Sequence, residues 1–153
     1  MSVYYLLFTK FMPKNKKDEI KEKSGESKKG SSKKKVLIIE DDTMISGMYK
    51  MKLEDHGFIA LTASDGNEGL LLAKKEKPDL ILLDIMMPMV DGFSVLAEIK
   101  AAPGMKDTPV IIMTNLGTTE DIEKGKKMGA SDYVVKADLT PAQIVEKVEK
   151  YIR

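Results

Sequence analysis

The sequence predicts a doubly wound α/β domain with a parallel sheet over residues 36–153. Five short apolar runs begin 22 to 30 residues apart, and the segments between them carry helical spacing. Gaps of that size are typical of strand–helix–strand units, and near-continuous apolar runs are typical of strands that are buried on both faces. The expected strands are 36–39, 58–61, 80–83, 110–113 and 133–135.

Each interval between two runs contains its own helix signals. The first helix is expected to follow Asp42 and to stop at Gly57, because glycine is favoured just beyond a helix end. The second opens after Asp65 and closes before Pro78, and the third follows Asp91-Gly92. The fourth lies between Thr118 and Gly129, and the last has Thr140 as N-cap, Pro141 in its first turn and Gln143 closing a capping box.

The fourth helix has the weakest apolar face. Its apolar content is little more than Ile122 and Met128, and Gly125 sits inside it at a cost of about 1 kcal/mol relative to alanine. Such a helix is either a mobile element or a plain surface helix, and the sequence leaves both open.

Residues 1–35 differ sharply in composition from the rest of the chain. They carry a net charge of +7, whereas residues 36–153 carry −6. We predict a basic, disordered tail, since residues 13–35 contain Ile20 as their single strong apolar residue and cannot offset the entropy of ordering. The run from Val3 to Phe8 is apolar, so residues 1–12 are either an apolar anchor or a stretch upstream of a true translation start at Met12.

Composition also excludes several classes of protein. The chain has no Cys and one His, which rules out disulfides, thiolate nucleophiles and multi-histidine metal sites. No apolar run has the roughly 20 residues needed to cross a bilayer, and no secretory signal is recognisable, so we expect a cytoplasmic protein. Neither a P-loop nor a G-x-S-x-G elbow occurs, which argues against a turnover enzyme.

Polar residues follow the apolar runs directly, where the strands are expected to end. In open α/β sheets the ligand crevice lies outside the carboxyl ends of the strands, so these groups should converge. Clustered carboxylates without His or Cys suit Mg²⁺, and a carboxylate beside Mg²⁺, an ammonium and a hydroxyl is well placed to attack phosphorus. The residues are Glu40, Asp41 and Asp42 after the first run, Asp84 after the third, Thr114 and Asn115 after the fourth, and Lys136 after the fifth.

Residues 36–153 resemble the receiver domain of two-component response regulators over their whole length. The resemblance rests on the order and spacing of Glu40-Asp41, Asp84-Ile85-Met86-Met87-Pro88, Asp91-Gly92, Thr114 and Tyr133-Val134-Val135-Lys136. It implies a flavodoxin-like sheet with strand order 2-1-3-4-5, and phosphorylation of Asp84 by a phosphohistidine on a sensor histidine kinase or phosphotransfer protein. It also implies Mg²⁺ held by Asp41, Asp84 and the Met86 main-chain carbonyl, with Glu40 acting through a bound water.

The resemblance further assigns the remaining site residues. Lys136 contacts the phosphoryl oxygens, Thr114 moves towards them and Tyr133 turns inward as a switch. Asp42 falls one place beyond the usual acidic pair, so we expect it to cap the first helix. Two positions depart from the family pattern. Ala137 follows Lys136 where many receivers have a Pro joined by a cis bond, and Asn115 follows Thr114 where a smaller residue is common, which restricts access of the phosphodonor.

We therefore expect a phosphoacceptor switch that catalyses only its own phosphorylation and dephosphorylation. Because the chain ends soon after the last helix, we expect no DNA-binding output domain, and we expect the output to be contact with an unknown downstream protein. The rival interpretation is an adapter that binds a polyanion or a membrane surface through residues 1–35, with the receiver fold as a scaffold. Salt-dependent nucleic-acid binding that vanishes on deleting residues 1–35 would favour the rival.

Overall fold

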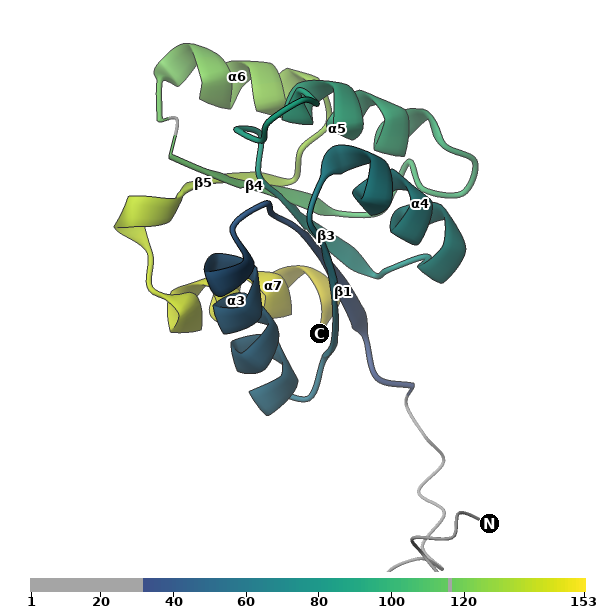
Figure 1. Ribbon diagram of the computed structural model, residues 1–153, viewed down its shortest axis with the longest axis vertical. Helices are drawn as coiled ribbons and strands as arrows, with labels where there is room; N and C mark the ends of the chain where they lie inside the picture. Colours follow the sequence, from purple (N-terminus) through teal and green to yellow (C-terminus); the bar gives the residue numbers. More distant parts are fainter. Residues whose placement is uncertain (1–31, 116) are drawn as a thin grey trace, which may run out of the picture. The chain divides into compact units, whose positions relative to one another are not determined.

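Five parallel strands form one sheet in the computed structural model, which describes residues 32–115 and 117–153. The strand order is β2-β1-β3-β4-β5, which confirms the order implied by the resemblance (Figure 1). The predicted tail lies almost wholly outside the described residues. The strands are β1 (Lys35–Ile39), β2 (Ile59–Ala63), β3 (Leu80–Leu83), β4 (Val110–Thr114) and β5 (Asp132–Val135).

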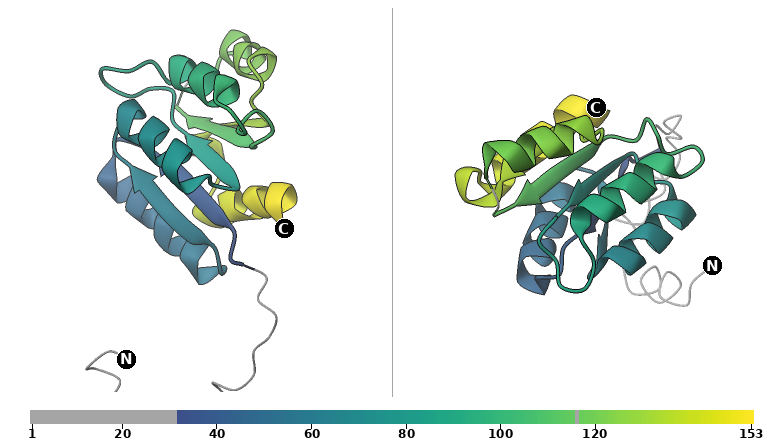
Figure 2. Two further views of the ribbon diagram at one scale, coloured as in Figure 1. Left: turned by 90° about the vertical axis from the view of Figure 1, so that its right-hand side faces the viewer. Right: turned by 90° about the horizontal axis from the view of Figure 1, so that it is seen from above.

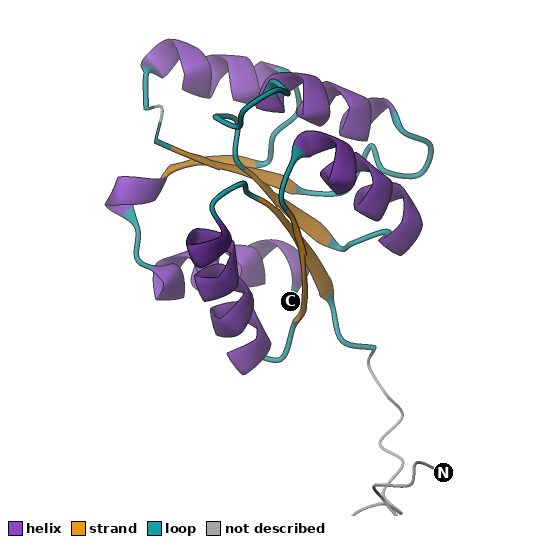
Figure 3. Ribbon diagram, in the orientation of Figure 1, coloured by secondary structure: helices purple, strands orange, loops and turns teal. Residues whose placement is uncertain are grey.

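Helices cover both faces of this sheet, which lies between two helical layers (Figure 3). Helices α3 (Thr43–Asp55) and α7 (Pro141–Ile152) pack on one face around a core that includes Tyr49, Leu53 and Val148. Helices α4 (Gly66–Glu76), α5 (Gly92–Ala101) and α6 (Thr119–Lys127) lie on the other face (Figures 1 and 2). A short 3₁₀ turn, η1 (Lys136–Asp138), joins β5 to α7.

The central strands are buried on both faces, as their continuous apolar runs predict. Residues 36–39 of β1 and all four residues of β3 have no exposed surface. Ile39 pairs with Leu83, and Leu83 pairs with Ile112, so β1, β3 and β4 end at nearly the same level. The residues that follow these strands are therefore brought to one edge of the sheet.

The predicted caps begin the helices where the sequence places them. Asp42 accepts hydrogen bonds from the backbone N–H groups of Met44 and Ile45 at 2.9 and 3.1 Å, which confirms its role as the cap of α3. Asp65, Asp91 and Thr118 cap α4, α5 and α6 through the same kind of contact. Thr140 and Gln143 form the complete capping box at the start of α7.

Strand β2 differs from its predicted span of 58–61 by starting at Ile59 and continuing to Ala63. Phe58 is still tied to the preceding helix, because its N–H donates to the Leu53 carbonyl at 3.1 Å. The far end is set by pairing with β1, in which Ile39 lies opposite Ala63. Register with a neighbouring strand, rather than local apolar content, fixed both ends.

Helix α6 is the least buried helix of the described chain. Gly125 is its one buried residue, whereas α5 buries five. Ile122 and Met128 are only partly buried, as their sparse spacing predicted. The Lys124 ammonium lies 4.1 Å from the centroid of the Phe93 ring and so links α6 to α5.

The ends of the described domain lie at the edge of the sheet away from the carboxyl ends of the strands. Strand β1 begins there, and α7 runs back to it after leaving η1 at the carboxyl edge, as Figure 1 shows for the C-terminus. Among the described residues, no helix combines the length and the apolar composition needed to cross a bilayer.

Candidate functional site

Two buried carboxylates and a lysine with a largely buried side chain meet at the carboxyl edge of the sheet. Glu40 follows β1, Asp84 follows β3 and Lys136 opens η1 after β5. The Asp84 backbone N–H donates to the Ile39 carbonyl at 3.0 Å, so Asp84 is aligned on β1 immediately beside Glu40. Parallel pairing thus joins side chains that are 44 and 52 residues apart in the sequence.

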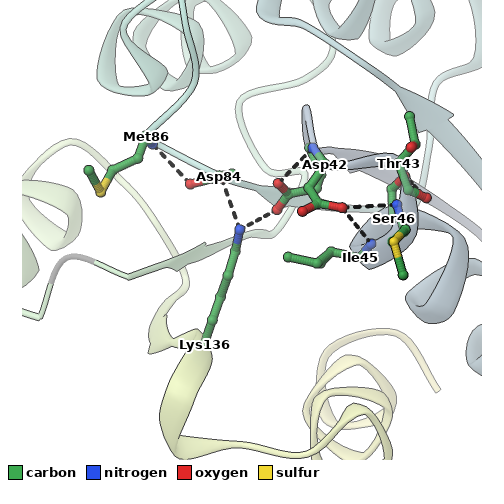
Figure 4. Close-up of polar contacts among 9 residues, drawn as sticks. Asp42, Thr43, Ile45, Ser46, Asp84, Met86 and Lys136 are labelled. Carbon is green, nitrogen blue, oxygen red and sulfur yellow. Dashed lines mark hydrogen bonds and ion pairs between the residues drawn. The ribbon is translucent and has the colours of Figure 1, made fainter.

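The Lys136 ammonium bridges both carboxylates. It donates to Asp84 Oδ2 at 2.9 Å and also pairs with Glu40 Oε2. Figure 4 shows the Lys136 side chain extending from η1 towards Asp84. The side chains of Lys136, Glu40 and Asp84 are 9%, 2% and 5% exposed, so water screens these charges poorly. The sequence predicted that Lys136 belongs to the site but not that it also holds Glu40.

The pKa values of Glu40 and Lys136 are both raised, for different physical reasons. Burial raises the pKa of Glu40, the Asp84 charge raises it further, and the Lys136 contact only partly offsets both. Burial also disfavours the charge of Lys136, but hydrogen bonds and charges from Glu40 and Asp84 outweigh it and raise the pKa of Lys136. The ammonium therefore stays charged within the carboxylate pair.

Asp41 completes a cluster of three carboxylates that fits a hard divalent cation. Oxygen atoms of Glu40, Asp41 and Asp84 all lie within 4.8 Å of one another, with Asp41 exposed and the other two buried. An all-oxygen set with one solvent-facing member suits Mg²⁺, which keeps several of its waters and takes few carboxylates. Neighbouring backbone groups orient two members, since Glu40 accepts from the Asp42 N–H at 3.2 Å and Asp84 from the Met86 N–H at 2.9 Å.

Thr114 and Tyr133 lie on the strands next to this cluster. Thr114 is fully buried at the end of β4, where it pairs with Val135, the residue before Lys136. Tyr133 is half-buried and packs against the core beneath α4–α6. Burial and the charges of Asp121 and Asp84 raise the pKa of Tyr133 to about 12. The phenol is thus close enough to α6 and to the acidic site to sense the charge of both.

The remaining predicted positions line the rim of the site. The Met86 side chain is half-exposed and points away from the carboxylates (Figure 4), while the role of its carbonyl as a metal ligand stays a prediction. Asn115 is exposed directly after Thr114. No peptide bond among the described residues is cis, so Lys136 and Ala137 are joined by a trans bond, and the chain turns into η1.

Sequence reasoning gave no function to Gly92, although it quoted the Asp91-Gly92 pair. Gly92 is buried at the start of α5, and its N–H faces the Ile85 carbonyl at 3.4 Å. A Cβ built on Gly92 would come 2.2 Å from the Ile85 Cα and 2.8 Å from the Asp84 carbonyl oxygen. The available signal was the glycine itself, placed where α5 begins in spite of its poor helix propensity.

Comparisons with known proteins agree with this geometry. The family model for the response regulator receiver domain matches residues 36–149. A probable transcriptional regulator, ycf27, of Guillardia theta is 39% identical over 122 residues, which cover 80% of this chain and 46% of that protein. The alkaline phosphatase synthesis transcriptional regulatory protein PhoP of Bacillus subtilis is 35% identical over 120 residues, 78% of this chain and 49% of the relative. The chain thus spans about half the length of these relatives.

Solved structures match the fold over the same region. The chemotaxis protein CheY4 of Vibrio cholerae superposes with a TM-score of 0.74 at 30% identity, covering 78% of this chain and 99% of that one. A CheY-like receiver domain protein from Methanospirillum hungatei superposes with a TM-score of 0.72 at 31% identity, covering 79% and 94%. The strand order, the acidic edge and the extent of the family match lead to one conclusion: the chain belongs to the response regulator receiver domain family.

Proposed function

We propose that the chain is a cytoplasmic phosphoacceptor switch that takes a phosphoryl group on Asp84 from a phosphohistidine donor. The observation that carries the proposal is the position of Asp84, whose carboxylate contacts the Lys136 ammonium and lies beside the carboxylates of Glu40 and Asp41. A carboxylate oxygen of Asp84 would attack phosphorus, the N–P bond of the donor would break, and the donor imidazole would leave with the electron pair and take up a proton. The product is an acyl phosphate.

The surrounding residues supply what this transfer needs. Asp41 and Asp84, with Glu40 through water, would hold Mg²⁺, which when bound offsets charge on the phosphoryl oxygens. The Lys136 ammonium, 2.9 Å from Asp84, is within reach of a phosphoryl oxygen on that residue after it leaves Glu40. Thr114 and Tyr133 would respond to the new charge. The chain is a regulator on this account, since the phosphoryl group stays on its own side chain.

The output is proposed to be contact with a downstream protein. The curated relatives are named as transcriptional regulators, and one of Synechocystis is named as DNA-binding, but the match covers 46% and 42% of two of them. The helical surface beside Tyr133, and α6 in particular, is the part of the described domain best placed to change with the charge on Asp84.

The test is intact-mass analysis after incubation with acetyl phosphate and Mg²⁺. The wild-type chain is expected to gain one phosphoryl group, and Asp84→Asn is expected to gain none. Chelation of the metal should also abolish the gain. Asp65→Asn is the matched control, because asparagine keeps the cap of α4 and the residue lies outside the acidic cluster. A phosphoryl group on Asp84→Asn, or none on the wild type with any donor, contradicts the proposal.

A further inference from the structure

The backbone of Asp84 is held from two sides. On one side its N–H donates to the Ile39 carbonyl of β1 at 3.0 Å. On the other side the first turn of α5 presses against it through Gly92, which is buried. Strand β3 itself ends one residue earlier, at Leu83, so the sheet alone does not fix the peptide that follows Asp84.

The contact at Gly92 is one that no other residue can make. A Cβ there would lie 2.2 Å from the Ile85 Cα, 2.8 Å from the Asp84 carbonyl oxygen and 2.9 Å from the Ile85 Cβ. The first two are backbone atoms, which cannot swing aside as the end of a side chain does. Gly92 is the first residue of α5 and does not have a positive φ, so close approach, and not an unusual φ, is the reason for glycine.

We propose that Gly92 is a positioning residue for the phosphoacceptor: it lets α5 abut the Asp84–Ile85 backbone and thereby sets where the Asp84 carboxylate meets Lys136, Glu40 and Asp41. The inference deepens the proposed function and rests on it. Asp91 supports the arrangement, because its side chain accepts the Phe93 N–H at 3.2 Å and so starts α5 at Gly92. Any side chain at position 92 must displace either α5 or the Asp84 backbone.

A side chain at position 92 would leave the site with the same residues but would move the Asp84 carboxylate relative to Lys136, Glu40 and Asp41. The carboxylate oxygens of Asp84, Glu40 and Asp41 now lie within 4.8 Å of one another, and Lys136 reaches Asp84 at 2.9 Å. Outer residues that orient metal ligands are worth about 10- to 100-fold in metal affinity. A misplacement of about 1 Å at a reacting group costs about 100-fold in rate.

The experiment compares Gly92→Ala with two controls in the full chain. Gly47→Ala makes the same change in α3, at an exposed position with nothing within 4 Å of the added Cβ. Ile99→Ala removes a fully buried side chain from α5, seven residues after Gly92, and so destabilises that helix while the glycine is kept. The measurements are urea unfolding, the Mg²⁺ dissociation constant by titration, and the rate of acyl-phosphate formation from acetyl phosphate.

We expect Gly92→Ala to raise the Mg²⁺ dissociation constant about tenfold or more and to slow acyl-phosphate formation about 100-fold. Gly47→Ala and Ile99→Ala should leave both within about twofold at temperatures where they are folded, although Ile99→Ala loses stability. A Gly92→Ala chain that binds Mg²⁺ and takes up phosphorus as the wild type does would overturn the inference. If the wild type takes up no phosphorus, the proposed function fails first.

A measurement on the wild type decides the question if Gly92→Ala does not fold. In NMR spectra the backbone amides of Gly92 and Phe93 should shift together with those of Asp84 and Ile85 when Mg²⁺ and then beryllofluoride are added. The amide of Gly47, which lies in open surroundings, should stay unchanged. Shifts at Asp84 and Ile85 with none at Gly92 would show that the contact does not couple α5 to the phosphoacceptor, and the inference would fall.

Discussion

Lys136 holds together a carboxylate pair that would otherwise repel itself. Glu40 and Asp84 are both buried, and the ammonium between them contacts each. Removing one member of such a group leaves an uncompensated buried charge, which costs far more than removing an exposed ion pair. In the unphosphorylated chain, Lys136 therefore stabilises the fold as a buried cation. The same side chain is proposed to contact the phosphoryl group after phosphorylation.

Lys136→Met is expected to lower the free energy of unfolding by about 3 kcal/mol in magnesium-free buffer near pH 7. Adding Mg²⁺ should recover much of the loss, because a divalent ion among Glu40, Asp41 and Asp84 replaces the missing charge. The matched control is Lys147→Met, whose partner Asp132 is 23% exposed, and which should cost about 1 kcal/mol or less. Equal losses for the two variants in urea melts would contradict this account of Lys136.

Tyr133 gives the domain a pH dependence in the alkaline range. The phenol has a pKa of about 12 in the folded chain, against about 10 when unfolded, because burial and the charges of Asp121 and Asp84 disfavour phenolate. The raised value contributes stability that is fully present below pH 10 and is lost as the pH rises through 12.

Tyr133→Phe should remove one phenol that ionises near pH 12 in a titration followed by ultraviolet absorbance. The free energy of unfolding of the wild type should also fall more steeply between pH 10 and pH 12 than that of Tyr133→Phe, since only the wild type can release this proton on unfolding. If the phenol lost in Tyr133→Phe ionises near pH 10 instead, Tyr133 does not sense the acidic site.

At the scale of the elements, the neighbouring helices α5 and α6 differ in how many of their residues are buried. Helix α5 buries Phe93, Val95, Leu96 and Ile99 against the sheet, while α6 buries only Gly125. Apolar burial supplies most of the stability of a helix within a domain, so α6 depends on its Thr118 cap and on Lys124 lying over the Phe93 ring. A helix held this lightly can change position at a small cost in free energy.

Backbone amides of α6 are therefore expected to exchange with deuterium much faster than those of α5 or α7 under native conditions. The helices α5 and α7 serve as internal references in the same sample, since each buries four or more residues. Beryllofluoride with Mg²⁺ should change the exchange of α6 more than that of α7. Equal protection in α6 and α5 would mean that the sparse apolar face of α6 does not make it mobile.

The elements also show how far the sequence alone reaches. Each helix start was predictable because one side chain, such as Asp42 or Thr140, caps it through contacts with residues two or three places away. The ends of β2 were predicted less well, since they depend on pairing with β1 across 24 positions. Local signals act within one turn, while register is decided by the partner strand.

At the scale of the whole molecule, the sequence predicted which residues meet at the carboxyl edge of the sheet. It did not predict which of them are in contact. Parallel strands of similar length must bring Glu40, Asp84 and Lys136 to one edge, and the sequence shows which residues follow each strand. It does not show that Lys136 spans both carboxylates or that Gly92 abuts the Asp84 backbone. Those two contacts depend on how far the Lys136 side chain reaches and on how closely α5 packs against the Asp84 backbone. The spacing of residues along the sequence gives no information about either.

The position of the two ends of the domain has a consequence for how it can be joined to other proteins. Strand β1 starts and α7 stops on the side opposite the acidic edge, so a fused partner, a fluorescent label or a further segment attached at Arg153 leaves the acidic edge open to a donor. The point of attachment at Arg153 itself therefore lies away from Asp84 (Figure 1). A change in charge at Asp84 can affect a unit attached at Arg153 only through the length of the sheet, or through the helices that cover it.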